Sequence, residues 1–167
     1  MIEYTTFDSP IGKIYIVAVK EGVVKISFSN ESPEELERYC QKNLWVGVRK
    51  GSEYTRDAKQ QILKYFEGRS QSLDFPVIHL NSPFRKKVLE VERNIPYGET
   101  RSYGEVAKMV NNPRASRAVG SANAENPLPL YFPCHRIITS NGRLGGFGGG
   151  LNVKQYLLDL EADIETS

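Results

Sequence analysis

The residues best suited to chemistry in this chain are a cysteine and the histidine that follows it, Cys134 and His135, with Arg136 next. A thiolate attacks electrophilic carbon, and neighbouring positive charge and a histidine both favour thiolate over thiol. A lone cysteine is nevertheless more often a small buried hydrophobic residue. Adjacent side chains of an extended chain point in opposite directions, so a bridging water or a bent backbone would have to link Cys134 to His135. The pattern therefore predicts a candidate nucleophile and leaves the structural role open.

The remaining cysteine and histidine add no second site. Cys40 lies in the first expected helix and is interpreted as structural, and His79 stands alone near the middle of the chain. No CxxC or HxxxH spacing links them to Cys134 and His135, so we expect no metal site and no cofactor. Two cysteines cannot build a disulfide framework, which favours a reducing compartment.

Two arginines three positions apart, Arg114 and Arg117, stand before Cys134 in a segment of small residues. Asn112 is expected to cap a helix here and Pro113 to open it, which would place both arginines near one face at its N-terminus. Such an end binds phosphate well. Because small side chains bury little surface, the backbone of this helix could also approach a groove of DNA closely.

A second helix precedes the arginine-bearing one. Residues 102–105 form a capping-box pattern that opens a short helix ending near Val110, and residues 111–113 are expected to make a tight turn. Two short helices joined in this way are typical of a helix-turn-helix. Helix pairs are common, so this pattern leaves both DNA binding and a purely structural role open.

The charges are unevenly distributed. Residues 1–76 carry 11 basic and 11 acidic residues, residues 85–154 carry 11 basic and 5 acidic ones, and four acids then close the chain. A basic middle favours a localised anionic partner such as nucleic acid, although an ordinary solvated surface has the same composition.

The glycine-rich segment 142–150 matches neither GxGxxG nor the phosphate-binding loop GxxxxGK[ST], which disfavours nucleotide binding. We interpret it as a loop whose backbone N–H groups lie against a flat ligand, with Phe147 as a stacking surface.

The elements that must position these residues fall into two groups. β-Branched and aromatic residues predict three strands over 2–8, 13–20 and 23–29, followed by helices from Ser32 and over about 53–67. Leu73–Pro76 is expected to be a short return strand or a connector, and the domain boundary is expected near residues 76–81. Further along, we expect a helix from Pro83 to about Asn94, a strand over 137–139, and a last helix with Leu157, Leu158 and Leu160 in the core.

Composition narrows the class of protein. The 167 residues are 40% hydrophobic and 25% charged, which is typical of a globular chain and argues against a disordered or coiled-coil one. The longest apolar run, residues 14–19, is too short to span a bilayer, and the N-terminus lacks a secretory pattern. We therefore expect a soluble intracellular protein without membrane contact.

Several motifs together identify a family. The chain resembles the O6-alkylguanine-DNA alkyltransferases, suicide DNA-repair proteins, from about residue 80 to its end, and only in outline before that. The motifs that carry the resemblance are Ile95-Pro96-Tyr97-Gly98, Ser102-Tyr103, Pro113-Arg114-Ala115-Ser116-Arg117-Ala118-Val119-Gly120, Asn126-Pro127-Leu128-Pro129, Pro133-Cys134-His135-Arg136, Gly146-Phe147-Gly148-Gly149-Gly150 and Glu161.

The resemblance implies an α+β fold with two parts. Residues 1–79 would form a ribonuclease-like subdomain with an antiparallel sheet and helices, and residues 80–167 a helical subdomain with the helix-turn-helix and the active-site cysteine. It also implies a role for each catalytic residue. Cys134 would take the alkyl group, His135 would act as base through a water, and Glu161 would orient the imidazole. Tyr103 would offer its phenol to N3 of guanine, and Asn126 would pin the active-site turn.

The implied substrate is O6-alkylguanine, and O4-alkylthymine as well, in a nucleotide flipped out of duplex DNA that is bound through its minor groove. Arg117 would fill the gap left in the duplex. The other residues implied to contact DNA are Tyr103, Arg114, Ala115, Ser116, Gly120 and Arg136. The residues implied to line the alkylguanine pocket are Phe147, Gly148, Pro129 and Ile137. The protein is expected to act as a monomer, in the cytoplasm or, in a eukaryote, the nucleus.

Three departures from the family pattern concern the pocket and metal binding. Phe147 stands where many members have tyrosine, Gly148 stands where some have serine, and the zinc site of mammalian members is expected to be absent. Three other functions remain to be weighed. A non-catalytic sensor of alkylated DNA would lack the cysteine, a thiol hydrolase would turn over many times, and a helix-turn-helix regulator would bind a defined sequence.

Overall fold

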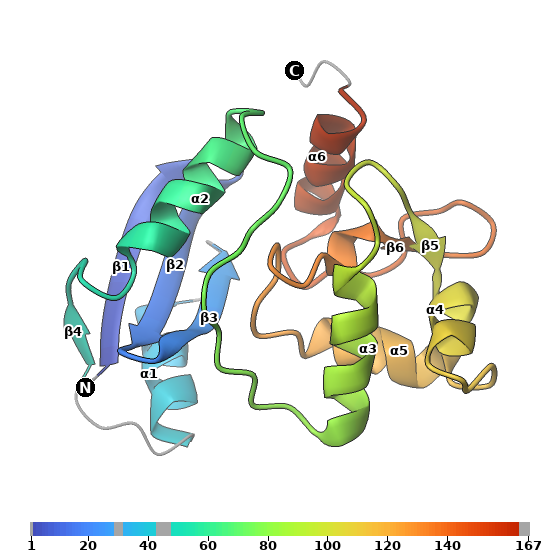
Figure 1. Ribbon diagram of the computed structural model, residues 1–167, viewed down its shortest axis with the longest axis horizontal. Coiled ribbons are helices and arrows are strands. Elements are labelled where there is room, and N and C mark those ends of the chain that lie inside the picture. The colour runs from blue at the N-terminus through green and yellow to red at the C-terminus, as the bar shows by residue number, and fades with distance from the viewer. Residues whose placement is uncertain (1, 29–31, 43–47, 164–167) are drawn as a thin grey trace. The chain divides into compact units, whose positions relative to one another are not determined.

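The computed structural model describes residues 2–28, 32–42 and 48–163. The chain divides into two compact units, Met1–His79 and Leu80–Ser167 (Figure 1). Each unit is α+β in composition, with its sheet and helices packed around its own core. Among the described residues, no helix combines the length and the apolar character needed to cross a bilayer.

The first unit is built on a four-stranded sheet with the order β3-β2-β1-β4. Its antiparallel strands are β1 (Ile2–Ser9), β2 (Gly12–Val19) and β3 (Gly22–Phe28), which confirms the predicted meander. The end predicted for the third strand, Ser29, lies outside the described residues. A short strand that the sequence did not predict, β4 (Val48–Lys50), pairs parallel to β1.

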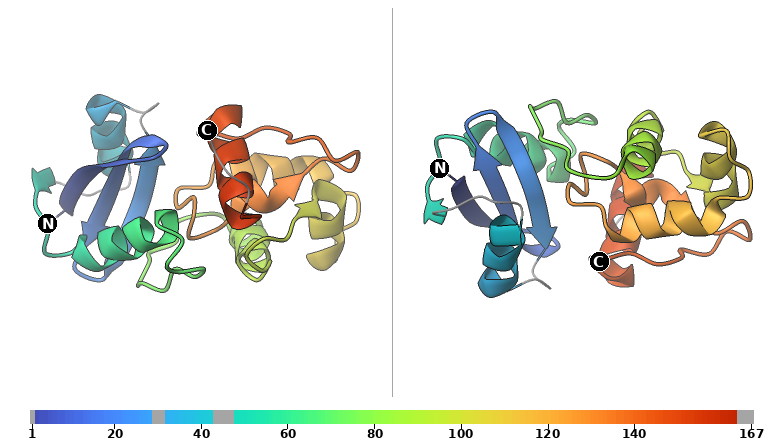
Figure 2. Two further views of the ribbon diagram at one scale, coloured as in Figure 1. Left: turned by 90° about the horizontal axis from the view of Figure 1, so that it is seen from above. Right: turned by 90° about the horizontal axis from the view of Figure 1, so that it is seen from below.

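Within the described residues this unit has two helices, α1 (Pro33–Lys42) and α2 (Arg56–Phe66), which cover opposite faces of the sheet (Figure 2). The predicted capping box at the start of α1 is present, because the Glu35 N–H donates to Ser32 Oγ and the Ser32 N–H donates to the Glu35 carboxylate. Leu73–Pro76 is a connector, and Val77 after it makes one isolated bridge to Val23.

The second unit is helical, with one two-stranded parallel sheet. In chain order its elements are α3 (Pro83–Arg93), β5 (Arg101–Ser102), α4 (Tyr103–Met109), α5 (Ser116–Ala124), the 3-10 turn η1 (Cys134–Arg136), β6 (Ile137–Ile138) and α6 (Leu151–Glu161). Strands β5 and β6 pair beside one another, so the segment before α4 and the segment after η1 are held together. This pairing brings the start of α4 close to turn η1, which contains Cys134.

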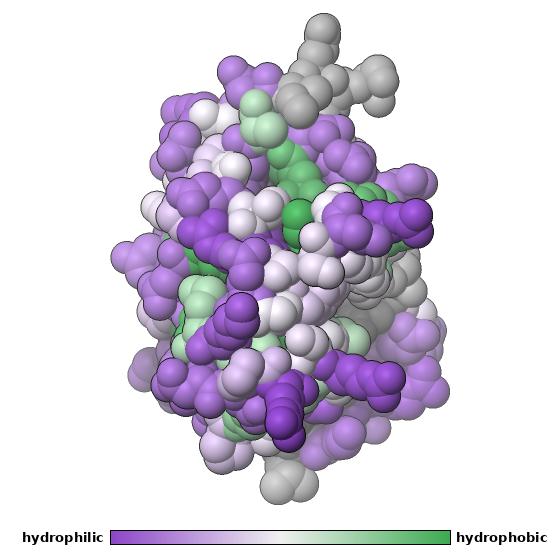
Figure 3. Space-filling model, turned by 90° about the vertical axis from the view of Figure 1, so that its right-hand side faces the viewer, coloured by the Kyte–Doolittle hydropathy of each residue, from purple (hydrophilic) through white to green (hydrophobic). Residues whose placement is uncertain are grey.

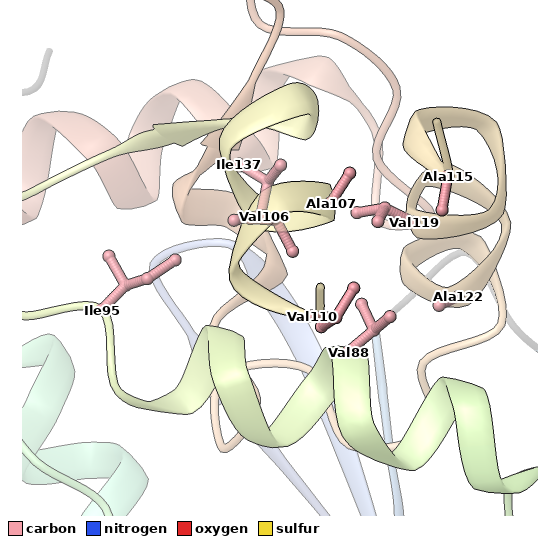
Figure 4. Close-up of a cluster of buried hydrophobic side chains, with 9 residues drawn as sticks. All are labelled: Val88, Ile95, Val106, Ala107, Val110, Ala115, Val119, Ala122 and Ile137. Atoms are coloured by element: carbon pink, nitrogen blue, oxygen red, sulfur yellow. The ribbon is translucent and has the colours of Figure 1, made fainter. Parts of the chain in front are cut away.

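A hydrophobic cluster joins α3, α4 and α5 (Figure 4). Val88 of α3, Val106 of α4 and Val119 of α5 are each fully buried in it. The cluster also holds Ile95, Ala107, Val110, Ala115, Ala122 and Ile137. Because its members come from α3, α4 and α5, this core fixes the helix-turn-helix against α3.

The helix-turn-helix is present, but its second helix begins later than predicted. Asn111 takes a left-handed conformation, with φ of 60°, and ends α4, since the Asn112 N–H donates to the Ala107 carbonyl at 2.9 Å and the Asn111 N–H to Lys108. The Ala115 N–H then bonds to the Asn112 carbonyl, and α5 starts only at residue 116. Asn112 therefore does not cap α5 and Pro113 does not open it. Arg114 lies in the turn and not on the helix.

The buried face of α6 also differs from the prediction. Leu157 is fully buried as expected, whereas Leu158 and Leu160 are only partly buried. Lys154 and Glu161 occupy the remaining buried positions, at the spacing that places them on the same helix face as Leu157. Their polar groups are buried because each finds partners inside the unit.

Candidate active site

The chain around Cys134 is bent. Turn η1 begins directly after Pro133, and the Arg136 N–H donates to the Pro133 carbonyl at 2.9 Å. The neighbouring Cys134 N–H donates to the Phe132 carbonyl at 2.7 Å. The backbone is therefore not extended at Cys134 and His135, so their side chains need not point in opposite directions. A bent backbone is one of the two arrangements that the sequence analysis named for linking these side chains.

Asn126 holds this turn from the preceding loop. Its amide nitrogen donates to the Phe132 carbonyl at 3.0 Å and lies 3.3 Å from the sulfur of Cys134. Its amide oxygen accepts from the Leu128 N–H at 2.9 Å. One side chain thus connects the loop, Phe132 and the sulfur of Cys134.

Beside the cysteine lies a buried His–Glu–Arg group. His135 Nε2 lies 2.6 Å from a carboxylate oxygen of Glu161, and all three side chains are at least nine-tenths buried. His135 Nδ1 is buried and has no hydrogen-bonding partner among the described residues. The glutamate therefore fixes one ring nitrogen, and the other is left open to accept a proton.

Arg136 is an internal partner of Glu161, so its expected contact with DNA is wrong. Its Nε and Nη2 donate to the two carboxylate oxygens at 2.7 and 2.9 Å, and its Nη1 donates to the Ile95 carbonyl at 2.7 Å. A planar guanidinium fits a carboxylate in this two-bond geometry. Because the guanidinium is engaged and buried, it supports the active site from within.

The protonation state of Cys134 differs from the sequence analysis, in which neighbouring positive charge and a histidine favoured the thiolate. Burial raises the pKa of the Cys134 thiol to about 12, with a further rise from Glu92, so the resting group is a protonated thiol and not a thiolate. Burial also lowers the pKa of His135, which keeps the imidazole neutral near pH 7. A neutral base beside a protonated thiol can take its proton at the moment of reaction.

Cys134 opens into a cavity of about 390 Å³. Its lining residues are Tyr103, Gly120, Asn123, Ala124, Cys134, Gly146, Phe147 and Gly148. Five of these residues were predicted site residues: Tyr103, Gly120, Cys134, Phe147 and Gly148. The cavity is formed by parts of α4, α5, η1 and the glycine-rich loop. A cavity of this size accommodates a flat, ring-sized ligand.

Three other predicted site residues lie elsewhere. Pro129 and Ile137 are not among the cavity-lining residues, and the side chain of Ile137 is fully buried in the hydrophobic core. Ala115 is also in that core, with 8% of its surface exposed, and its contact with DNA stays a prediction. Ile137 and Ala115 are apolar, and both side chains pack in the hydrophobic cluster of α3, α4 and α5.

Arg114 and Arg117 are exposed, as a phosphate-binding or groove-binding role requires, and Ser116 is partly exposed beside them. Figure 3 shows the side of this unit that carries α4 and the loop before α6, where hydrophilic side chains surround smaller pale and hydrophobic areas. Helix α5 therefore carries exposed Arg117 and also contributes Gly120 to the lining of the cavity.

Sequence reasoning missed Lys154, which ties the glycine-rich loop to the site. Its ammonium group donates to the carbonyl of Ile137 at 2.5 Å, to that of Leu144, and to that of Gly146 at 3.4 Å. The signal that could have found it is its spacing, since a buried leucine follows it by three residues on α6. A lysine held in this way fixes the loop that carries Phe147.

The same loop passes close to Tyr103. Gly145 has φ of +71°, and a Cβ atom there would lie 2.9 Å from the Tyr103 phenol oxygen. Glycine is therefore required both by the backbone conformation and by the close approach. Burial raises the pKa of Tyr103, with Cys134 and Glu92 adding to the rise, so its hydroxyl remains a proton donor.

Comparisons with known proteins cover nearly the whole chain. Residues 83–163 match the family model described as 6-O-methylguanine DNA methyltransferase, DNA binding domain, and residues 2–78 match the ribonuclease-like domain of the same proteins. A methylated-DNA–protein-cysteine methyltransferase of Methanosarcina acetivorans is 41% identical, over 95% of this chain and 97% of its own length. The constitutive one of Bacillus subtilis is 35% identical, over 95% of this chain and 94% of its own length. Among solved structures, Mycobacterium tuberculosis OGT in complex with DNA is similar with a TM-score of 0.85 and 34% identity, covering 96% of this chain and 93% of that one.

Proposed function

The chain belongs to the 6-O-methylguanine DNA methyltransferase family, and from that premise we propose that Cys134 removes the alkyl group from O6-alkylguanine in duplex DNA and keeps it. The coarser activity, DNA repair by transfer of an alkyl group to a protein cysteine, follows from family membership. The observation that carries the finer assignment is the placement of Cys134 in a ring-sized cavity, beside a neutral histidine whose second nitrogen is held by Glu161.

The transfer is a single displacement at carbon. Cys134 loses its proton to His135 through a bridging water, and its sulfur forms a bond to the alkyl carbon while the bond from that carbon to O6 breaks. Glu161 stabilises the imidazolium that forms, as the carboxylate does in a hydrolase triad. The electron pair passes into the guanine, and the Tyr103 phenol donates a hydrogen bond to N3 that stabilises the negative charge of the leaving base. Because the thioether is stable, each molecule reacts once.

The alkyl group on O6 lies at the major-groove edge of the stacked base, whereas the protein is proposed to approach through the minor groove and its sulfur is buried. The nucleotide must therefore leave the duplex to react. We assign Arg117 to the gap left behind, since it is exposed on α5, the helix that also lines the cavity. Arg114 and Ser116 would contact the backbone beside it, and the small residues of α5 allow approach through the minor groove. We propose O4-alkylthymine as a second substrate, and we propose that the protein acts as a monomer.

The function is tested by intact mass after incubation with duplex DNA that carries one O6-methylguanine. We expect each protein molecule to gain the mass of one methylene group, and peptide mapping to place it on Cys134. Release of more product than protein would indicate a hydrolase. Tight binding selective for the lesion, without a mass change, would indicate a sensor, and either outcome contradicts the proposal.

Arg117→Ala should slow repair of duplex DNA about tenfold or more while affecting the reaction with free O6-benzylguanine much less. The free base needs no flipping, so it has no use for a residue that fills the duplex. The measurement is a pair of second-order rate constants, with Arg69→Ala as the control because that arginine is exposed in the first unit. Equal losses on both substrates would contradict the role of Arg117.

A further inference from the structure

The loop that follows α3 contacts the His–Glu–Arg group, and the proposed mechanism does not use it. This loop, residues 95–98, is one of the motifs that carry the family resemblance. Its first residue, Ile95, is buried in the hydrophobic cluster. The Glu99 N–H then closes a turn by donating to the Pro96 carbonyl at 3.0 Å, and Gly98 takes a left-handed conformation there, with φ of +83°. The loop therefore has a defined conformation beside the site.

The backbone of this loop binds the carboxylate of Glu161. The Gly98 N–H donates to Glu161 Oε1 at 3.2 Å, and the same oxygen accepts from Arg136 Nε. Glu161 Oε2 accepts from Arg136 Nη2 and lies 2.6 Å from Nε2 of His135. A carboxylate oxygen has about two lone-pair sites, and each oxygen accepts two of these bonds. The carboxylate therefore has little freedom to rotate away from His135.

The loop also holds the end of α6, the helix that carries Glu161. The Tyr97 hydroxyl donates at 3.4 Å to the carbonyl of Leu160 in the last turn of the helix, where carbonyls lack the usual partner four residues further on. Burial and the charge of Glu161 raise the pKa of Tyr97, so its hydroxyl stays protonated and can donate. A Cβ atom at Gly98 would lie 3.2 Å from the backbone carbonyl oxygen of Glu161. A side chain there would displace Glu161 by a few tenths of an ångström.

We propose that residues 95–98 form a positioning element for alkyl transfer, in which the Gly98 N–H and the Tyr97 hydroxyl hold Glu161 in place. Glu161 in turn holds the imidazole of His135 in the orientation that leaves Nδ1 open to accept the thiol proton. This inference rests on the proposed function, because it adds a layer of support to the proton transfer of that reaction. Glycine is required at position 98 both by the left-handed backbone and by the close approach of α6.

The first test observes the imidazole of His135 itself. The chain has two histidines, so NMR spectra of protein labelled with 15N-histidine contain two imidazoles, and His79 is the internal reference. We expect the wild-type Nε2–H proton of His135 far downfield, because a short hydrogen bond to a carboxylate deshields it. In Gly98→Ala this proton should move upfield, because the added Cβ atom displaces Glu161. The imidazole signals of His79 should not move.

The second test measures the rate of alkyl transfer at saturating methylated duplex DNA and the second-order rate constant with free O6-benzylguanine. Gly98→Ala should slow both reactions about tenfold, and by the same factor, because both need the same proton transfer from a correctly placed base. Its affinity for DNA should equal that of wild type, which distinguishes this loss from that of Arg117→Ala.

Gly68→Ala is the matched control. Gly68 has φ of +72°, and no atom of the described residues lies within 4 Å of the added Cβ atom, so this variant carries the backbone strain without the contact. Its two rates and the His135 signals should equal those of wild type.

Tyr97→Phe tests the same loop with a smaller change. It removes the hydroxyl and keeps the ring, whose centroid lies 5.8 Å from the guanidinium carbon of Arg136. Transfer should be about two- to threefold slower, with a smaller upfield movement of the His135 proton. Tyr4→Phe is its control, since Tyr4 is a partly buried tyrosine of the first unit, and should behave as wild type.

A folded Gly98→Ala protein with the His135 signals of wild type, or with the rates of Gly68→Ala, would overturn the inference. If Gly98→Ala does not fold, Tyr97→Phe decides, and wild-type rates and His135 signals in that variant would overturn the inference as well. These failures differ from failure of the proposed function, in which wild type itself would take up no alkyl group.

Discussion

Cys134→Ser is expected to lower alkyl transfer by at least about 10⁴-fold, to below detection on the time scale of the wild-type reaction. A serine hydroxyl is a far weaker acid and nucleophile than a thiol, and the buried site raises the pKa even of the thiol to about 12. His135 is neutral and only moderately basic, so it can assist a thiol but not generate a serine alkoxide. Among the described residues, no other thiol and no aliphatic hydroxyl lines the cavity.

The measurement is intact mass with methylated duplex DNA, together with the affinity of the same variant for that DNA. Binding should survive, because exposed Arg114 and Arg117 are untouched and serine is slightly smaller than cysteine. Cys40→Ser is the matched control and should still gain one methylene group per molecule. A Cys134→Ser protein that still takes up the alkyl group would refute the assignment of the nucleophile.

Glu161→Gln is expected to destabilise the protein by about 3–5 kcal/mol and to slow transfer by about 10²-fold or more. The substitution keeps the size of the side chain but removes the charge that the Arg136 guanidinium and His135 share inside the unit. The guanidinium would remain buried without a counter-ion, and the imidazolium formed in the reaction would lose its stabilising partner. Denaturant unfolding measures the first effect, and single-turnover kinetics measures the second.

The pH dependence of this effect has a definite direction. The hydrogen bonds and charges of His135 and Arg136 outweigh the opposing effect of burial and lower the pKa of Glu161 below its ordinary value of 4.5. A carboxyl group whose pKa is lowered by folding stabilises the protein above its unfolded pKa, and that stabilisation is lost as the pH falls. The stability difference between wild type and Glu161→Gln should therefore be largest near neutral pH and shrink below about pH 4.5. A difference that grows in acid would contradict the role of the carboxylate.

A variant of Arg136 separates its contribution from that of Glu161. Arg136→Gln leaves the bond between His135 and Glu161 intact, so it should lower stability with a smaller loss of rate. Its affinity for DNA should not fall, since the guanidinium is buried. Asp159→Asn, also on α6, is the control for loss of one negative charge from that helix.

Local sequence patterns predicted most of the helices and strands, because helix caps and strand propensity depend on residues close together in the chain. The capping boxes at Ser32 and Ser102 are present where expected, since the groups involved are three residues apart. The predicted start of α5 was wrong because two end signals compete there. Asn111 ends α4 in a left-handed conformation, and this removes Asn112 from the capping position that its residue type favours.

The sequence by itself determined the family, the candidate nucleophile and the arginine-bearing helix, since a motif such as Pro133–Arg136 records residue types at short spacings. Only the tertiary structure decided which polar groups are buried and what they pair with. Arg136 meets Glu161 from 25 residues away in the chain, and Lys154 meets the Ile137 carbonyl from 17 residues away. The Gly98 N–H meets the Glu161 carboxylate from 63 residues away. Burial and long-range pairing set the charge state of each group, and no local pattern carries that information.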